Sequence, residues 1–162
     1  MNKAKKVLGI DPGSAICGWG VVESLSPQKS RLVECDCIRT RASMSTAERL
    51  RSLHLDLQAV IAKYQPDEVA VEELFFVQNV KTGIVVGQAR GVILLAAAEA
   101  GLPIFEYKPN TIKLALTGYG HADKKQVQDM VKLILKLPNY IKQDDTADAV
   151  AVALTHIQSR QF

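Results

Sequence analysis

The sequence has few cysteines and no long apolar run, and each of these scarcities excludes a class of protein. Its three cysteines are Cys17, Cys35 and Cys37, an odd number without metal-type spacing, which argues against both disulfides and a cysteine metal site. The longest apolar run, from Val92 to Ala98, is far too short to span a bilayer. We therefore expect a cytoplasmic protein with no membrane segment.

A secretory signal and internal repeats are also missing. Lys3, Lys5 and Lys6 lie near the start, but no signal-type apolar region follows them. The 162 residues contain no repeat, no low-complexity segment and no linker, so we expect one domain over residues 1–162. The formal net charge of +3 permits binding to nucleic acid without requiring it.

The most informative stretch runs from Val7 to Ser14 (VLGIDPGS) and predicts a short strand that ends in a carboxylate and a tight turn. Pro12 and Gly13 stop the strand, so a rigid sheet would hold Asp11 in place. A buried acid costs desolvation energy unless a cation compensates it, and Gly13 leaves room for a phosphate or an ion. On this stretch alone, an aspartate that only accepts hydrogen bonds from turn amides is an equal alternative.

The period of the apolar residues predicts three strands, a helix, a strand, a helix and a strand, followed by further helices. Short connections favour antiparallel pairing of the first three strands, and strand–helix–strand crossovers favour parallel pairing of the later ones. We therefore expect an α/β fold with a five-stranded mixed sheet and helices on both faces. The expected strands are 7–11, 16–23, 31–40, 68–72 and 103–107, and the expected helices are 46–64, 82–100, 110–116, 124–137 and 144–159.

Four carboxylates are expected to converge in this topology, namely Asp11, Glu72, Asp145 and Asp148. The first two end parallel strands at one rim, and the last two share one face of a helix. Because like charges raise one another's pKa, such a cluster calls for divalent cations, and Mg²⁺ combines a few carboxylates with substrate phosphate. Two such ions would clamp a phosphodiester. Alternatively, Asp145 and Asp148 are an N-cap and a first-turn acid, and Glu72 ends a strand in solvent.

Aromatic and basic residues near these acids predict a nucleic-acid surface. Phe75 follows Glu72 in a loop and is interpreted either as core or as a wedge between bases. Lys113, Lys124 and Lys125 flank a glycine-bearing loop and could neutralise backbone phosphates, although a solvated face is the alternative.

Three glycines, Gly83, Gly87 and Gly91, recur every four residues on one predicted helix. Each costs about 1 kcal/mol against alanine in a helix, so a close backbone neighbour is expected. The chain's own sheet and a partner's helix remain equal alternatives for that neighbour. Of the histidines, we interpret His54 and His156 as structural.

With these motifs in place, the sequence resembles the RuvC family of bacterial Holliday junction resolvases, which are crossover junction endodeoxyribonucleases. The resemblance covers nearly the whole chain and implies a ribonuclease H-like fold. It implies that the four acids, Asp11, Glu72, Asp145 and Asp148, are catalytic and bind Mg²⁺, with Mn²⁺ as a substitute and two ions when DNA is bound. The motifs that carry it are LGIDPGS, VAVEELFF, GQARGVILLAAAEAGLPIFEY, KKQVQDMVKLILKLP and DDTADAVAVALTH.

The resemblance also implies partners. Phe75 matches an aromatic residue inserted at the junction centre, and Lys113 and Lys124 match residues for junction binding and catalysis. The family acts as a homodimer on four-way junction DNA, nicks two opposing strands symmetrically in recombination and repair, and leaves 5′-phosphates. It works with the RuvA–RuvB branch-migration complex.

Three other classes of protein are alternatives to a junction resolvase. The motif GIDPGS also resembles the first phosphate loop of actin-like ATPases and sugar kinases, but those need two such domains and a second glycine-rich loop. A related nuclease that acts on ribosomal RNA precursors is the second alternative. That function would not explain Phe75 or the lysines downstream of it, which favour the junction enzyme. A non-catalytic DNA-binding module is disfavoured because four acids near phosphate weaken binding unless metals are present.

Overall fold

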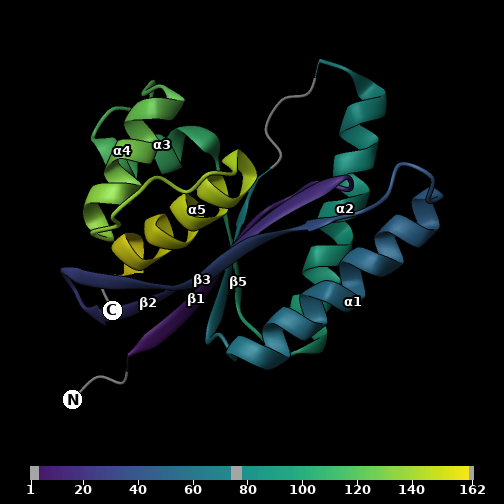
Figure 1. The fold of residues 1–162 in the computed structure, drawn as a ribbon, viewed down its shortest axis with the longest axis horizontal. Helices are drawn as coiled ribbons and strands as arrows, with labels where there is room; N and C mark the ends of the chain where they lie inside the picture. Colours follow the sequence, from purple (N-terminus) through teal and green to yellow (C-terminus); the bar gives the residue numbers. More distant parts are fainter. Residues whose placement is uncertain (1–3, 74–77, 161–162) are drawn as a thin grey trace.

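The computed structural model describes residues 4–73 and 78–160 and contains a five-stranded sheet with helices on both faces (Figure 1). This arrangement confirms the expected α/β class and the expected order of elements. The strands are β1 (Lys5–Asp11), β2 (Ile16–Ser26), β3 (Lys29–Arg39), β4 (Glu68–Glu72) and β5 (Ile104–Tyr107). The helices are α1 (Thr46–Tyr64), α2 (Val80–Glu99), α3 (Pro109–Thr117), α4 (Lys124–Ile134) and α5 (Asp144–Arg160).

Two helix boundaries differ from the predicted ones by more than one residue, and both differences have identifiable reasons. Helix α2 begins two residues early because the side chain of Asn79 accepts hydrogen bonds from two backbone N–H groups of the first turn. Helix α4 ends three residues early because Lys136 adopts a left-handed conformation with φ of 52°. The N–H of Leu137 then bonds to the carbonyl of Lys132 at 3.0 Å, which closes the helix before Pro138.

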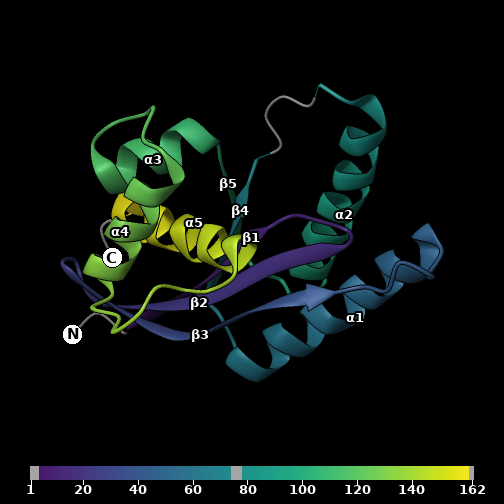
Figure 2. The ribbon, with the colours of Figure 1, turned by 45° about the horizontal axis from the view of Figure 1, so that its top comes forward.

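The strand order β3-β2-β1-β4-β5 brings the two predicted acidic strand ends together (Figure 2). Strand β1 pairs with β2 in antiparallel fashion, with Asp11 opposite Gly18, and with β4 in parallel fashion, with Ile10 opposite Val71. Because β1 and β4 run in the same direction, Asp11 and Glu72 lie at the same rim of the sheet, as predicted.

Helix α5 lies closer to the sheet than any residue with a side chain would allow. A Cβ on Gly9 would lie 2.0 Å from the carbonyl oxygen of Ala149, and one on Gly18 would lie 1.9 Å from that of Asp145. Both distances are impossible for real atoms, so only glycine fits at these positions. The close packing at Gly18 fixes the start of α5 against β2.

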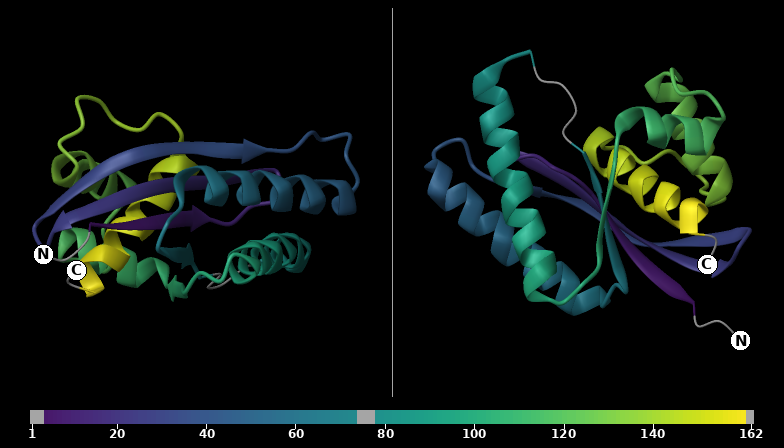
Figure 3. Two further views of the ribbon diagram at one scale, coloured as in Figure 1. Left: turned by 90° about the horizontal axis from the view of Figure 1, so that it is seen from below. Right: turned by 180° about the vertical axis from the view of Figure 1, so that it is seen from behind.

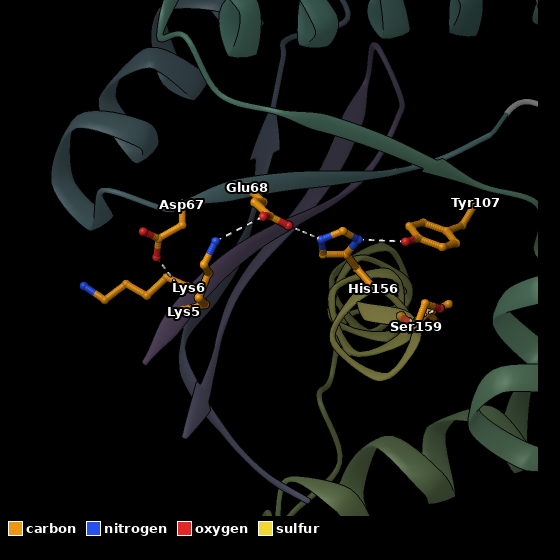
Figure 4. Close-up of polar contacts among 8 residues, drawn as sticks. Lys5, Lys6, Asp67, Glu68, Tyr107, His156 and Ser159 are labelled. Atoms are coloured by element: carbon orange, nitrogen blue, oxygen red, sulfur yellow. Dashed lines mark hydrogen bonds and ion pairs between the residues drawn. The ribbon is translucent and has the colours of Figure 1, made fainter. Parts of the chain in front are cut away.

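A buried polar chain joins α5 to the far end of β4, as Figure 4 shows. The side chain of His156 is fully buried and contacts the carboxylate of Glu68 at 2.5 Å and the hydroxyl of Tyr107 at 2.7 Å. Burial lowers the pKa of His156, so we assign a neutral ring that donates to Glu68 and accepts from Tyr107. Burial raises the pKa of Glu68, but hydrogen bonds from His156 and Lys5 outweigh it and hold that pKa below its usual value. The prediction that His156 is structural is confirmed.

Helix α2 is apolar on its exposed side. It packs beside α1 (Figure 3, right) through residues of its second half, while Val80 is 74% exposed and Ile84 is 57% exposed. A Cβ on Gly87 or Gly91 would meet no described atom within 4 Å, so of the two alternatives for their neighbour, the chain's own sheet is excluded at these two positions.

The same helix is long and apolar enough to cross a bilayer, judged by length and composition alone. That observation is weak here. Ala89 and Ile93 are buried in the core, and the side chain of Arg90 pairs with Glu106 at 2.5 Å near the middle of the helix.

Candidate active site

Four acidic side chains from three elements gather at the rim of the sheet, above the start of α5. Asp11 and Glu72 point to the α5 face, because the positions two residues before them, Gly9 and Ala70, pack against that helix. Asp145 and Asp148 come from the first two turns of α5, which Gly18 holds against the strand next to Asp11. The structure confirms the prediction that the four acids converge.

The electrostatics of this cluster require a cation or a proton. Burial, reinforced by the negative charges of Glu72 and Asp148, raises the pKa of Asp11 to about 9. Burial also raises the pKa values of Glu72 and Asp148. The side chains of Asp11 and Glu72 share a hydrogen bond, which needs a proton on one of the two carboxyl groups. The cluster therefore holds a proton on Asp11 at neutral pH unless positive charge replaces it.

Two of the predicted lysines border the acids. The ammonium of Lys124 lies 3.3 Å from carboxylate oxygens of both Asp144 and Asp148. Lys113 and Lys124 line a cavity of about 300 Å³ together with Glu72 and Asp148. The positive charges of both lysines partly offset the raised pKa of Glu72. A phosphate in this cavity would therefore meet cationic and acidic groups side by side.

The structure argues against the alternative that Asp145 and Asp148 only cap a helix. Asp148 is the fifth residue of α5 and bonds to Lys124 rather than to a backbone N–H group. The side chain of Asp145 makes no hydrogen bond with any residue that the structure describes. Asp144, which sequence reasoning passed over, contributes a further carboxylate through its contacts with Lys124 and Gln128. Its place directly before Asp145 was the available signal.

Other predicted residues lie outside the cluster or outside the description. The ammonium of Lys125 contacts Asp129 at 2.5 Å and lies 4.1 Å from the ring centroid of Tyr140, and Lys125 does not line the cavity. His121 stacks edge-on against Tyr119 with ring centroids 5.7 Å apart. Phe75 falls in residues 74–77, outside the described residues, so its prediction stays open.

A metal ion would find oxygen donors here but no closed cage. Over residues 4–73 and 78–160, no three or more histidine, cysteine, aspartate or glutamate side chains are arranged to hold a metal ion by themselves. Carboxylates that share a proton are nevertheless a fitting donor set for a hard divalent cation that also takes ligands from phosphate and water. The donor chemistry therefore fits Mg²⁺, with part of the coordination left to substrate.

Comparison with known proteins identifies the family of this chain. Residues 7–156 match the family model described as crossover junction endodeoxyribonuclease RuvC. The chain belongs to the RuvC family. The RuvC of Roseiflexus sp. (strain RS-1) is 54% identical over 94% of this chain and 90% of its own length. That of Heliobacterium modesticaldum is 55% identical over 91% of each chain.

Solved RuvC structures share the fold. T. thermophilus RuvC in complex with Holliday junction substrate superposes with a TM-score of 0.93 at 39% identity and covers 97% of this chain and 95% of its own. The yeast mitochondrial Holliday junction resolvase Ydc2 superposes with a TM-score of 0.67 at 13% identity, covering 95% of this chain and 79% of its own, which indicates the fold alone. The expected ribonuclease H-like fold is confirmed. RuvC proteins are metal-dependent endonucleases that resolve Holliday junctions, so the predicted enzyme class is confirmed as well.

Proposed function

We propose that this chain resolves four-way DNA junctions by hydrolysing one phosphodiester in each of two opposing strands, using Asp11, Glu72, Asp145 and Asp148. The observation that carries the proposal is the convergence of these buried acids beside two lysines, in a member of a junction-resolving family. Symmetric nicks that leave 5′-phosphates would let a ligase reseal both strands. The placement favours catalysis over mere binding, because uncompensated acids repel phosphate.

The cation that this site needs is best supplied by Mg²⁺, with Mn²⁺ as a substitute and two ions when DNA is bound. Asp11, Glu72, Asp145 and Asp148 would hold the ions. When bound, such ions activate water and stabilise the leaving oxygen of a phosphodiester. Asp11 and Glu72 would lose their shared proton on loading, so their carboxylates become ligands only when the acidic pair is fully ionised.

Lys113 and Lys124 supply positive charge that, unlike that of a metal ion, is a permanent part of the protein. Lys124, bridging Asp144 and Asp148 in the absence of DNA, would turn toward a phosphate oxygen when substrate enters the cavity. Lys113 would contact the same or the neighbouring phosphate. Phe75 would insert at the junction centre, and Lys125 would contact DNA only after releasing Asp129.

The partners that we propose are four-way junction DNA, a second copy of this chain and the RuvA–RuvB complex, in the cytoplasm. A two-fold dimer suits a junction whose opposing strands are equivalent. The exposed apolar side of α2, formed by Val80, Ile84, Gly87 and Gly91, supports the dimer, because these residues have no neighbour in the described chain to cover them.

The test of dimerisation is a charge on that surface. Ile84→Asp is expected to weaken self-association by about 100-fold, since an aspartate in an apolar interface would be buried without a partner. Light scattering at micromolar concentration should report single chains. Leu133→Asp is the matched control, because Leu133 is 68% exposed on α4 and should leave the dimer intact. A wild-type monomer, with or without DNA, would contradict the proposal.

The proposed activity is tested by cleavage of a labelled synthetic four-way junction, with a linear duplex of the same sequence as control. Both are incubated with Mg²⁺ and with chelator. Paired nicks in the junction alone, lost with chelator, are expected. Equal cutting of both substrates would keep the nuclease site but contradict junction selectivity. No cutting in several junction sequences would point to a binding module instead.

A further inference from the structure

Strand β3 carries a cationic residue to the same rim of the sheet as the acids. Strand β2 pairs in antiparallel fashion with both β1 and β3, so β3 runs in the direction of β1 (Figure 2). Gly18 lies opposite Asp11 on one side and opposite Cys37 on the other. Arg39 ends β3 two residues beyond Cys37. It therefore lies at the acidic rim, on the side away from Lys113 and Lys124.

Arg39 also faces the same side of the sheet as the acids. Side chains alternate along a strand, and Ile38 is buried in the core beneath α1 and α2. Its neighbour Cys37 points to the opposite face, where its thiol contacts the side chain of Gln143 at 2.6 Å directly before α5. Arg39 shares the face of Cys37 and hence the face of Asp11. The nearest acid in sequence, Asp36, takes the other orientation in this alternation.

The spacing fits a DNA strand that passes over both sites. Two strand spacings and two residues along β3 separate the backbones of Asp11 and Arg39, which amounts to about 12 Å. Successive phosphates on one strand of B-form DNA advance about 3.4 Å along the axis and also turn around it, so a straight separation of about 12 Å spans about two of them.

The positive charge of Arg39 is available to a ligand. Arg39 is exposed, and its side chain has no hydrogen bond or ion pair with any described residue. Lys142 is also exposed and lines a hollow with Cys35 and Gln143. An arginine binds phosphate through two parallel N–H donors, which fixes the strand as well as attracting it.

We propose that Arg39 contacts a backbone phosphate of the strand being cut, about two phosphates from the scissile bond on the β3 side of the acids. The proposal rests on the proposed function, since it takes the DNA to be bound at the acidic cluster. Arg39 is then a positioning residue that, with Lys113 and Lys124 on the other side, holds the strand at both flanks of the site.

The first test measures junction binding by the full chain in chelator as a function of salt. Arg39→Gln is expected to weaken binding about 5-fold at moderate salt and to reduce the slope of log K against log salt by about 1, as for one lost phosphate contact. Arg39→Lys should retain most of the slope. Arg31→Gln is the matched control, because Arg31 lies near the start of the same strand, toward the opposite rim, and pairs with Glu23. It should leave the slope unchanged.

The second test locates the contact. A neutral methylphosphonate is placed in turn at each phosphate flanking the cut. One position on one side is expected to weaken wild-type binding and to leave Arg39→Gln binding unchanged, because that variant has already lost the contact. Cleavage by Arg39→Gln should show a raised KM with little change in kcat.

The outcomes separate the two proposals. A slope for Arg39→Gln equal to that of the wild type and Arg31→Gln, with no coupled phosphate, would overturn the role of Arg39 while leaving junction cleavage in place. A wild-type chain that neither binds nor cuts junctions would instead overturn the proposed function itself.

Discussion

Replacing Asp11 by asparagine is expected to abolish junction cleavage and, at the same time, to make the metal-free protein more stable. The loss of activity should exceed about 1000-fold, because one ligand of the proposed metal site disappears. The gain in stability has a separate cause. Burial and the neighbouring acids raise the pKa of Asp11 to about 9, so an ionised Asp11 destabilises the folded chain, and asparagine carries no charge.

The sign of this effect depends on pH. In the unfolded chain the Asp11 carboxyl group loses its proton near pH 4, whereas in the folded chain it keeps the proton to about pH 9. Folding therefore binds a proton between these values, and the stability of the wild type falls as pH rises through this window. The advantage of Asp11→Asn should be small near pH 4.5 and reach about 2 kcal/mol at pH 8, or roughly 4–8 °C in Tm. Thermal unfolding in chelator at both pH values measures it.

Two glutamates on one strand provide the control for this prediction. Glu72 and Glu68 lie at opposite ends of β4 and on the same face of the sheet. Glu72→Gln should behave like Asp11→Asn. Glu68→Gln should keep cleavage and lose about 2 kcal/mol of stability, since it removes the charge that the buried His156 and Lys5 stabilise. If Glu72→Gln also lowers stability in chelator, the cluster is not under electrostatic strain, and our account of the site is wrong.

These two glutamates show which features of the site could be predicted from the sequence and which could not. The convergence of Asp11 and Glu72 followed from parallel pairing of two strands, which short-range patterns predict. Glu72 was placed in the cluster because it ends a parallel strand, but the pairing of Glu68 with His156 and Lys5 did not follow from the sequence. Only the docking of α5, which brings His156 to one end of β4 and Asp148 to the other, separates a structural carboxylate from a proposed catalytic one.

Contacts between distant surfaces were likewise beyond sequence patterns. Lys125 lies next to Lys124 in the chain, yet one turns to the acids and the other to Asp129 and Tyr140. Helix rotation and the path of the loop after α4 decide this, and neither leaves a local signature. The glycines of α2 predicted a close backbone neighbour, but only the packing of the helix shows that the described chain supplies none at Gly87 and Gly91.

The second large effect on cleavage is expected from Gly18, a residue that has no functional side chain. Gly18→Ala should lower cleavage by about 100-fold while junction affinity in chelator changes little, because a misplacement of about 1 Å in a site has this effect on rate. The added Cβ would lie 1.9 Å from the carbonyl oxygen of Asp145, and both atoms belong to rigid elements. The start of α5 must therefore move away from β2, and Asp145 and Asp148 move with it relative to Asp11.

The matched variant for this prediction is Gly20→Ala, two residues along the same strand. Its Cβ would meet a methyl group of Val150 at 2.5 Å, which a side chain can relieve by rotating. Both variants should lose about 1–3 kcal/mol of stability through overpacking, but only Gly18→Ala should lose most of its cleavage rate below the melting temperature. Equal losses of cleavage rate in the two variants would mean that the whole of α5 shifts on the sheet in both, rather than only its start in Gly18→Ala. The glycine opposite Asp11 would then matter for packing and not for aligning the acids.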